Sequence, residues 1–424
     1  MLEHDRPITR AWVLHPDLKS DYDRRAAGPA LEEAVALAAA LPDLEVVGET
    51  IVRLPKIQPG KLFGKGKIAE LKDLFAQAEV ELVLIDGPVT PVQQRNLEKE
   101  WGVKLLDRTS LILEIFSDRA RTSEGVLQVE MAALSYQRTR LVRAWTHLER
   151  QRGGLGFVGG PGETQIEADR RAIDTQMVQL KRQLDKVVKT RELHRASRAK
   201  VPFPVVALVG YTNAGKSTLF NRLTGAEVLA KDMLFATLDP TMRRIVLPSG
   251  DNVIMSDTVG FISSLPTELV AAFRATLEEV LDADLIVHVR DISHPQTEEQ
   301  ATDVDVILKS IGVPDDAPMI AVWNKIDRLD ADQADAVLAR ADRNEAVFAT
   351  SAVTGAGMAP LLDAIALHLQ DPRSEEVITL GFDAMRKRAW LFEAGVVQSE
   401  AQTEIGYEIN VLWTALQKER FTRL

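Results

Sequence analysis

The sequence predicts an α/β protein whose central domain contains a mostly parallel sheet. Three patterns support this fold class. An apolar run at residues 205–209 leads into a glycine-rich turn and then into helical spacing at residues 219–223, as in strand–turn–helix units. Apolar strand-like and helical segments alternate through the first 115 residues. Residues 126–200 carry apolar side chains every three or four positions, which indicates two long paired helices.

The chain has 424 residues, which is too long for one ordinary hydrophobic core. We expect a small α/β domain at residues 1–118, a long antiparallel helical hairpin at 119–200, the central domain at 201–371 and a small α+β appendage at 372–424. Two prolines within residues 201–204 mark the start of the central domain, because proline cannot continue a helix.

Composition is that of a water-soluble globular protein, with 46% hydrophobic and 27% charged residues. The lack of cysteine excludes disulfides, thiolate metal sites and cysteine nucleophiles. The first ten residues are charged, so we expect no signal peptide, and no apolar stretch has the length that a bilayer-spanning helix needs. The expected location is the cytoplasm, with at most a peripheral association with the membrane.

Charge is unevenly distributed along the chain. The net charge is −11, yet residues 119–200 contain 17 Lys and Arg against 9 Asp and Glu, a surplus of 8 that leaves −19 for the remainder. Two explanations of this basic segment remain open: a solvated helix face, or a surface that binds a polyanion.

The first domain is expected to follow a β-α-β-α-β-α-β order. Its predicted strands are residues 11–14, 44–54, 81–85 and 103–106, and its predicted helices are residues 29–41, 68–78 and 92–100. Residues 60–67, which read GKLFGKGK, could bind a second phosphate group. Because this stretch lacks the spacing of a phosphate-binding loop, a basic surface turn is the favoured interpretation.

The two helices of the predicted hairpin have matching apolar faces. These faces comprise Leu127, Met131, Leu134, Leu141, Trp145 and Leu148 in the first helix, and Ile166, Ile173, Met177, Leu180, Leu184 and Val187 in the second. The connection at residues 153–162 contains six glycines, whereas a helix reversal needs one or two. This density predicts a loop whose backbone approaches something large very closely; a floppy loop is the alternative.

The central turn matches the P-loop pattern, which binds phosphate groups. It comprises Gly210, Tyr211, Thr212, Asn213, Ala214, Gly215, Lys216, Ser217 and Thr218. Backbone N–H groups of such a turn, with the N-terminus of the next helix, form a cradle for anions. We expect Lys216 to contact the β- and γ-phosphates of a nucleotide and the Ser217 hydroxyl to hold Mg²⁺.

The next strands of the central domain are predicted at residues 244–247 and 252–256. Further residues expected near the phosphates come directly after the second of these strands. They are Asp257, Thr258, Val259 and Gly260. Asp257 can hold Mg²⁺ through a water molecule, and the Gly260 amide can meet the γ-phosphate. A loop between the P-loop and Asp257 contains two candidate switch threonines, Thr237 and Thr241.

The later strands of the central domain are predicted at residues 284–290, 319–323 and 346–350. The residues expected to bind the nucleotide base follow the last two of these strands. The residues concerned are Asn324, Lys325, Ile326 and Asp327, and then Ser351, Ala352 and Val353. The Asp327 carboxylate can accept two hydrogen bonds from guanine, whereas adenine has no such donor pair. The backbone at Ser351 and Ala352 would contact guanine O6. The order of these elements, each at the carboxyl end of a strand, indicates a GTPase.

The central domain resembles the P-loop GTPases of the translation-factor class in the Obg–HflX group, and the whole chain resembles the HflX family. Residues 235–241, FATLDPT, resemble the switch sequence of that family, and residues 153–165 resemble its glycine-rich motif. Residues 15–18 and 60–67 also fit. The resemblance implies GTP contacts by Phe235, Ala236, Thr237, Leu238 and Asp239. It also selects Thr237 as the switch ligand of Mg²⁺, so that Lys216, Thr237 and Gly260 are the expected catalytic residues.

The same resemblance implies a GTPase that hydrolyses GTP to GDP and phosphate with Mg²⁺ and binds the large (50S) ribosomal subunit and its rRNA. It would split or rescue stalled ribosomes under stress, with the hairpin directed toward the peptidyl-transferase region. The chain is expected to act as a monomer. The alternatives are a ribosome-assembly GTPase, a nucleotide-switched regulator of a membrane protease, and an ATP-driven RNA remodeller that uses residues 60–67.

Two residues refine the expected chemistry. Phe261 follows Gly260, where Ras-like enzymes have a glutamine that orients the attacking water, and neither Phe261 nor Ile262 can hydrogen-bond to water. Slow intrinsic hydrolysis is therefore expected, with the water positioned by backbone groups or by a partner. Asn213 resembles an asparagine with which some members of this class hold K⁺, and this assignment is left open. No arginine finger can be assigned.

The basic hairpin suits insertion into structured RNA, because its side chains would neutralise phosphates. The residues expected to do so are Arg138, Arg140, Arg143, Lys181 and Arg182. If this protein acts by binding RNA, neutralising these residues should abolish its activity. If it regulates a membrane protease instead, the same changes should leave its activity intact. The tail is expected to contain strands at residues 377–382 and 408–413 and a helix at 385–396.

Overall fold

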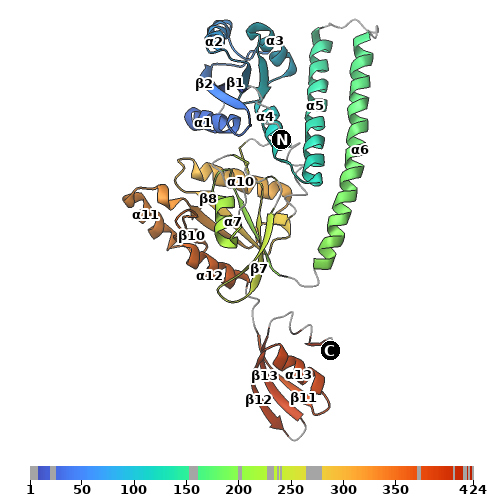
Figure 1. The fold of residues 1–424 in the computed structure, drawn as a ribbon, viewed down its shortest axis with the longest axis vertical. Coiled ribbons are helices and arrows are strands. Elements are labelled where there is room, and N and C mark those ends of the chain that lie inside the picture. Colours follow the sequence, from blue (N-terminus) through green and yellow to red (C-terminus); the bar gives the residue numbers. More distant parts are fainter. Residues whose placement is uncertain are drawn as a thin grey trace, which may run out of the picture. The chain divides into compact units, whose positions relative to one another are not determined.

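The computed structural model describes residues 8–19, 25–151, 161–198, 203–226, 234–235, 238, 241–263, 279–369, 374–403, 406–413, 418 and 421–422, without the side chains of 142–151, 161–166 and 188–198. The chain divides into two compact units, one of residues 1–246 and 252–360 and one of residues 247–251 and 361–424. The expected α/β class is confirmed (Figure 1). The four domain boundaries given above stay predictions.

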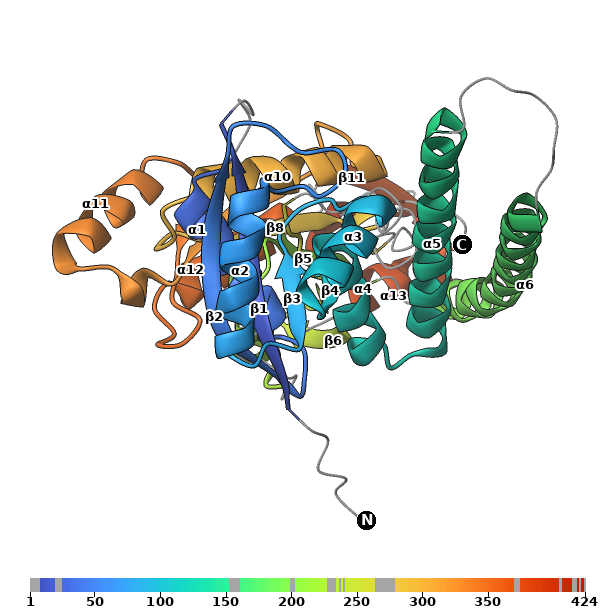
Figure 2. The same cartoon turned by 90° about the horizontal axis from the view of Figure 1, so that it is seen from above.

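The N-terminal sheet is parallel and has the strand order β2-β1-β3-β4. Its elements are β1 (Thr9–Leu18), α1 (Ala27–Ala38), β2 (Leu44–Leu54), α2 (Lys65–Gln77), β3 (Leu82–Ile85), α3 (Pro91–Trp101) and β4 (Lys104–Asp107). Successive side chains of a strand point to opposite faces. Val13 therefore packs with Leu37 of α1, while Leu14 packs with Leu71 of α2 and Leu97 of α3. Helices thus cover both faces of this sheet (Figure 2).

Residues Arg108–Arg119 form α4, a helix that the spacing of apolar residues does not predict. The carboxylate of Asp107, the last residue of β4, starts this helix by accepting a hydrogen bond of 2.9 Å from Ser110 N. Ile112 and Phe116 of α4 are buried in the core that also contains α1. The helix therefore completes the second layer beside the N-terminal sheet.

The long helices α5 (Ser123–Gln151) and α6 (Pro161–Arg198) pack side by side, which confirms the predicted helical hairpin (Figures 1 and 2). Arg138 of α5 and Asp174 of α6 form an ion pair of 2.8 Å across the helices. Residues 152–160, which make up most of the predicted glycine-rich loop, lie outside the described residues.

The central sheet has the order β10-β9-β8-β5-β7-β6 among its described strands. These are β5 (Val205–Gly210), β6 (Thr241–Val246), β7 (Asn252–Asp257), β8 (Leu285–Asp291), β9 (Met319–Asn324) and β10 (Val347–Ala349). Among these described strands, only the pairing of β6 with β7 is antiparallel. The described helices are α7 (Lys216–Thr224), α10 (Thr297–Ile311), η1 (Ile326–Arg328), α11 (Ala331–Ala341) and α12 (Met358–Leu369). The carboxyl ends of the parallel strands meet at one edge, where ligands bind in such sheets.

The C-terminal unit contains an antiparallel sheet of order β11-β13-β12. Its elements are β11 (Ser374–Gly381), α13 (Met385–Glu393), β12 (Val397–Thr403) and β13 (Gly406–Trp413). Leu391 of α13 packs with Ile409 and Trp413 of β13. Strand β12 reads VQSEAQT and was not predictable from apolar alternation, since pairing with β13 stabilises it instead. In the part of the chain that the structure describes, every helix is too short or too polar to cross a membrane.

Candidate functional site

The P-loop connects the carboxyl end of β5 to the first residue of α7, as the sequence predicts. Gly215 has φ +93°, a conformation that side chains with a Cβ rarely adopt. A Cβ on Gly215 would also lie 2.2 Å from Asn324 Nδ2, and one on Gly210 would lie 2.1 Å from the carbonyl oxygen of Val289. Both positions therefore require glycine, because neighbouring strands approach the loop so closely.

Lys216 is the first residue of α7 and is only 6% exposed. Its Nζ donates hydrogen bonds of 3.0 Å to the carbonyl oxygens of Gly210 and Tyr211. Burial lowers the pKa of Lys216 to about 8; the Asp257 carboxylate opposes this shift, and the Lys325 charge adds to it. A phosphate group beside the ammonium would stabilise its charge, which suits the role predicted for Lys216.

Ser217 and Asp257 bring two hard oxygen donors together. Ser217 Oγ donates a hydrogen bond of 2.7 Å to Asp257 Oδ2, so the start of α7 meets the end of β7. Mg²⁺ is usually held by one or two protein oxygens together with substrate phosphates and water. The donor set therefore fits the predicted metal. Ala236, Thr237 and Asp239 lie outside the described residues.

The segment after Asp257 lies directly against the P-loop. Thr258 Oγ1 donates to the carbonyl oxygen of Leu208 at 2.7 Å, and Val259 is buried. A Cβ on Gly260 would lie 2.9 Å from Thr212 Cγ2 and 3.0 Å from Lys216 Nζ. The Gly260 backbone is therefore beside the lysine that is predicted to bind the γ-phosphate.

Asn324, at the end of β9, connects the P-loop with the loop after β10. Its Nδ2 donates to the carbonyl oxygen of Ala214 at 2.9 Å, and its Oδ1 accepts from Ala352 N at 3.0 Å. The side chain is 1% exposed. This residue therefore positions both loops rather than facing solvent.

Asp327 lies in η1, close to the loop after β10. Ser351 Oγ donates a hydrogen bond to Asp327 Oδ1, which brings these two predicted base-binding residues together. Ile326 lies in the same short helix, whereas the Val353 side chain is 69% exposed. A carboxylate placed beside Ser351 and Ala352 can pair with two adjacent donors on a guanine edge.

Two residues of this site escape the sequence analysis. Asp291, the last residue of β8, forms an ion pair of 2.8 Å with Lys325 Nζ. Arg222 of α7 donates to the carbonyl oxygens of Ala352 at 3.1 Å and Val353 at 2.7 Å. A polar residue at the carboxyl end of a parallel strand is a usable signal for Asp291. For Arg222, which follows Lys216 by six residues in α7, the sequence contains no such signal.

Phe235, Leu238 and Thr241 are the described residues of the predicted switch; the side chains of Phe235 and Leu238 are buried, and Thr241 is the first residue of β6. Phe235 packs edge-to-face against Phe116 of α4, with ring centroids 4.6 Å apart. Any contact of Phe235 with GTP would therefore come from its backbone. The hydrophobic core thus extends from α4 into the switch.

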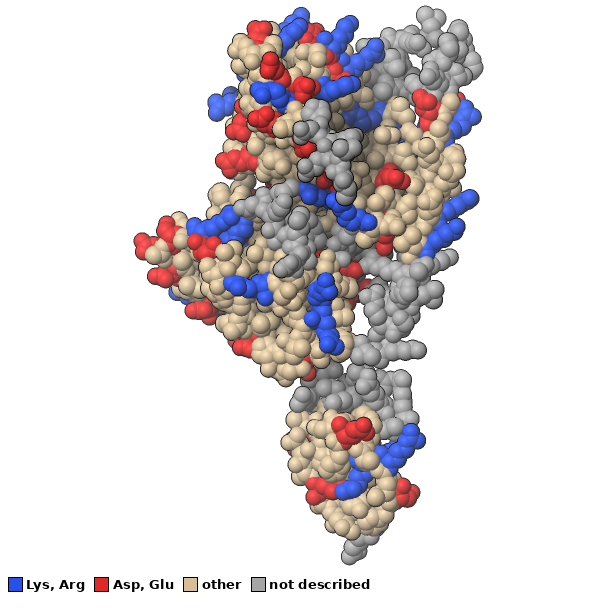
Figure 3. All heavy atoms as spheres, in the orientation of Figure 1, with Lys and Arg blue, Asp and Glu red and all other residues tan. Residues whose placement is uncertain are grey.

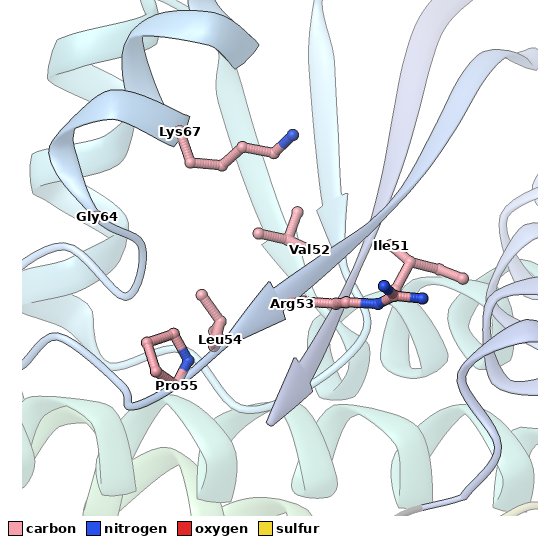
Figure 4. A pocket seen from close by; sticks show the side chains of 7 residues that line it. All are labelled: Ile51, Val52, Arg53, Leu54, Pro55, Gly64 and Lys67. Atoms are coloured by element: carbon pink, nitrogen blue, oxygen red, sulfur yellow. The ribbon is translucent and has the colours of Figure 1, made fainter. Parts of the chain in front are cut away.

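A separate cavity of about 540 Å³ lies between the end of β2 and the start of α2 (Figure 4). It is lined by Ile51, Val52, Arg53, Leu54, Pro55, Gly64 and Lys67. Lys67 Nζ donates to Glu70 Oε1 at 2.6 Å, and Lys61 pairs with Glu100. These lysines of residues 60–67 therefore make intramolecular ion pairs, as in a basic surface turn.

Asp327 can accept two hydrogen bonds from guanine, whereas adenine offers it no such pair of donors. A P-loop site with this carboxylate therefore defines a GTPase. Models of known families match four parts of the chain: "GTP-binding GTPase N-terminal" at residues 29–117, "GTP-binding GTPase Middle Region" at 119–198, "50S ribosome-binding GTPase" at 205–325 and "HflX C-terminal domain" at 336–423. The chain belongs to the HflX family of GTPases, and its relatives cover most of its length.

Curated relatives support this assignment. The GTPase HflX of Magnetococcus marinus is 50% identical over 85% of this chain and 82% of its own length. The GTPase HflX of Escherichia coli is 44% identical over 82% of this chain and 81% of its own. The putative GTP-binding protein 6 of Xenopus laevis is 35% identical over 92% of this chain and 74% of its own.

Proposed function

We propose that this GTPase acts on the large ribosomal subunit and splits or rescues stalled ribosomes. The observation that carries this proposal is the match of residues 205–325 to the family described as 50S ribosome-binding GTPases. Action on a precursor subunit during ribosome assembly is the second candidate, since it would need the same surface.

Hydrolysis would use the residues assembled at the carboxyl edge of the central sheet. Lys216 would bind the β- and γ-phosphates, and the Gly260 N–H would donate to the γ-phosphate. Ser217 and Thr237 would hold Mg²⁺ directly and Asp257 through water, and the ion would neutralise charge on the phosphates. Removal of Mg²⁺ with a chelator should abolish hydrolysis.

The attacking water would be positioned without the side chains of Phe261 and Ile262, the two residues after Gly260. Phe261 is buried and apolar, so it has no group that could orient the water. Intrinsic hydrolysis should therefore be slow and should accelerate when a partner completes the site. Asn213 Oδ1 lies 3.5 Å from Lys325 Nζ. If Asn213 instead holds K⁺, the kcat will be higher in K⁺ than in Na⁺.

The hairpin would provide the RNA-binding surface. Lys181, Arg182 and Lys186 are exposed on α6, and basic side chains project along this helix in Figure 3. Each cationic side chain near a phosphate releases condensed counterions, which favours association at low salt. A stiff, exposed, basic helix therefore suits a structured RNA.

Two of the five basic residues considered in the sequence are already engaged within the protein. Arg138 pairs with Asp174. Arg140 Nη1 donates to Asp107 Oδ2 at 2.9 Å and to the Tyr136 hydroxyl at 2.7 Å, so it fastens α5 to the N-terminal domain. The side chain of Arg143 lies outside the described ones. Lys181 and Arg182 are accordingly the better residues for testing RNA binding.

The test is GTP hydrolysis by the purified protein, alone and with large ribosomal subunits. We expect strong stimulation that a Lys181→Gln/Arg182→Gln variant loses and that falls as salt rises. A Lys309→Gln/Arg343→Gln variant removes two exposed charges from the central domain and should keep the stimulation. If ribosomal subunits neither stimulate hydrolysis nor co-sediment with the protein, the proposed ribosome role would be refuted, while the assignment as a GTPase would stand.

Sedimentation with mature and with precursor subunits separates rescue from assembly. Binding to precursors alone would favour the assembly role. A regulator of a membrane protease would need no RNA, and the Lys181→Gln/Arg182→Gln variant would then retain its full activity.

A further inference from the structure

The hydroxyl of Tyr211 joins three segments that are far apart in the sequence. It donates a hydrogen bond to Glu33 Oε2 on α1 and accepts one of 2.8 Å from Ser263 N. Tyr211 directly follows Gly210 in the P-loop, and Ser263 lies three residues beyond Gly260. One oxygen atom therefore connects the N-terminal domain to both sides of the phosphate site.

Glu33 is held rigidly by two guanidinium groups. Arg108 Nη2 of α4 donates to Glu33 Oε1 at 2.5 Å, and Arg25 Nη1 donates to the same oxygen at 2.8 Å. Arg108 Nη1 in turn donates to Asp86 at 2.6 Å, and Asp86 lies 2.8 Å from His15 Nδ1. The carboxylate of Glu33 is thus one member of a buried, multiply bonded ion cluster.

The charge state of Glu33 suits its role as an acceptor. Burial by itself would raise the pKa of Glu33, but the charges of Arg108 and Arg25 outweigh it and lower that pKa. The group is therefore ionised at neutral pH and can only accept hydrogen bonds. The proton between Tyr211 and Glu33 consequently belongs to the tyrosine, whose pKa is raised by burial and by the Glu33 charge.

The same cluster reaches the segment after Gly260 directly. Arg108 Nη2 donates to both the carbonyl oxygen and Oγ of Ser263 at 3.1 Å, and Ser263 Oγ donates to Glu33 Oε1 at 3.2 Å. Two residues closer to Gly260, Phe261 N donates to the carbonyl oxygen of Gly210 at 3.1 Å, and Thr212 N donates to that of Phe261 at 2.6 Å. Residues 260–263 are therefore fastened to the P-loop by backbone bonds and to the N-terminal domain by side chains.

We propose that Glu33 is a positioning residue for GTP hydrolysis, which acts through the Tyr211 hydroxyl and Ser263 to fix residues 260–263 against the P-loop. The Gly260 backbone lies beside Lys216 in this arrangement. Because Phe261 cannot orient a water molecule, the geometry at the γ-phosphate depends on backbone groups of this segment. A small displacement of such groups is enough to slow a reaction severely. The proposal rests on the nucleotide site described above and is independent of the ribosome.

The test uses the full chain without ribosomes. Tyr211→Phe removes one hydroxyl and keeps the buried ring, while Glu33→Gln removes the charge. We expect each variant to hydrolyse bound GTP about tenfold more slowly in single-turnover experiments, with a GDP dissociation constant within about threefold of the wild type. The double variant should be no slower than the slower single variant, since both changes break one linkage.

Tyr136→Phe is the matched control. Its hydroxyl donates to Asp107 and accepts from Arg140, so it makes a similar tyrosine–carboxylate–arginine contact away from the phosphate site. This variant should lose comparable stability in urea unfolding yet keep the wild-type rate of hydrolysis. An unchanged rate in Tyr211→Phe, or equal slowing in Tyr136→Phe, would overturn the positioning role.

The outcome is distinguishable from a failure of the ribosome proposal. A wild-type protein that hydrolyses GTP but ignores ribosomal subunits would refute the ribosome role alone. If the Tyr211→Phe and Glu33→Gln variants bind GDP and hydrolyse GTP as the wild type does, the positioning role alone would be refuted.

Discussion

The side-chain amide of Asn324 donates a hydrogen bond of 2.9 Å to the carbonyl oxygen of Ala214, which ties the carboxyl end of β9 to the P-loop. Through its Oδ1 the same amide accepts from the backbone of Ala352. The loops that carry the phosphate-binding and base-binding residues are therefore held together by one buried side chain.

Replacing Asn324 with alanine should weaken GDP binding. The change leaves the Ala352 N–H without its buried acceptor and separates the two loops, which costs ~1–3 kcal/mol, or roughly 5- to 150-fold in affinity. Fluorescent GDP titration measures the effect. Asn344→Ala, at an exposed position after α11, should bind GDP as the wild type does. Equal affinity in both variants would contradict the bridging role.

Asp327→Asn should change the preferred base. The asparagine amide offers one donor and one acceptor, which matches the edge of xanthine, whereas guanine presents two donors to this position. GDP affinity should fall on the order of 100-fold, while xanthosine diphosphate should bind better than it does to the wild type. Competition binding with both nucleotides measures this. Asp330→Asn removes the neighbouring helix-capping carboxylate of α11 and should leave base preference unaltered, because asparagine caps equally well.

Gly260→Ala should impair hydrolysis more than nucleotide binding. The added Cβ would lie 2.9 Å from Thr212 Cγ2 and 3.0 Å from Lys216 Nζ, so the backbone must move away from the P-loop. Losing one preorganised donor in a site of this type slows a reaction on the order of 100-fold. Single-turnover experiments measure the rate of hydrolysis, and GDP titration measures the nucleotide affinity. Gly66→Ala, in open space on α2, is the control and should match the wild type in both.

His288 should make the folded state less stable as the pH falls. Burial, together with the charges of Arg290 and Lys216, lowers the pKa of His288 on β8 to about 4; the Asp305 carboxylate is 3.9 Å away. Between pH 6.5 and 4 the unfolded chain therefore binds a proton that the folded chain does not. Stability from this group is complete above pH 6.5 and is lost on acidification.

Urea unfolding between pH 8 and 5 measures this dependence. His288→Gln should flatten the pH profile by on the order of 1–2 kcal/mol across that range. His368→Gln, at an exposed position on α12, should keep the wild-type slope. The same slope in both variants would show that other groups control the acid sensitivity.

Much of the fold follows from local sequence. Most strands of the N-terminal and central sheets are short apolar runs bounded by turns, and each strand predicted for these two sheets overlaps an observed one. Two elements that were not predicted have physical reasons. The five apolar residues of α4 all lie within residues 111–116, because α4 contacts both the N-terminal sheet layer and the switch, and this run is wider than the single stripe of an ordinary amphipathic helix. Strand β12 is polar because it depends on backbone pairing with β13, which no local pattern records.

The sequence by itself determined the P-loop and the order of the elements after it, because contiguous residues at the ends of strands create each of them. Only the tertiary structure decided how these elements act together. The partnership of Arg222 with Ala352 joins residues 130 positions apart, and that of Glu33 with Tyr211 joins residues 178 positions apart. The largely buried Glu33 carboxylate needs such partners because an unpaired buried charge is costly, whereas the exposed Arg222 reaches a carbonyl oxygen that only folding brings near; sequence spacing carries no information about which partners will meet.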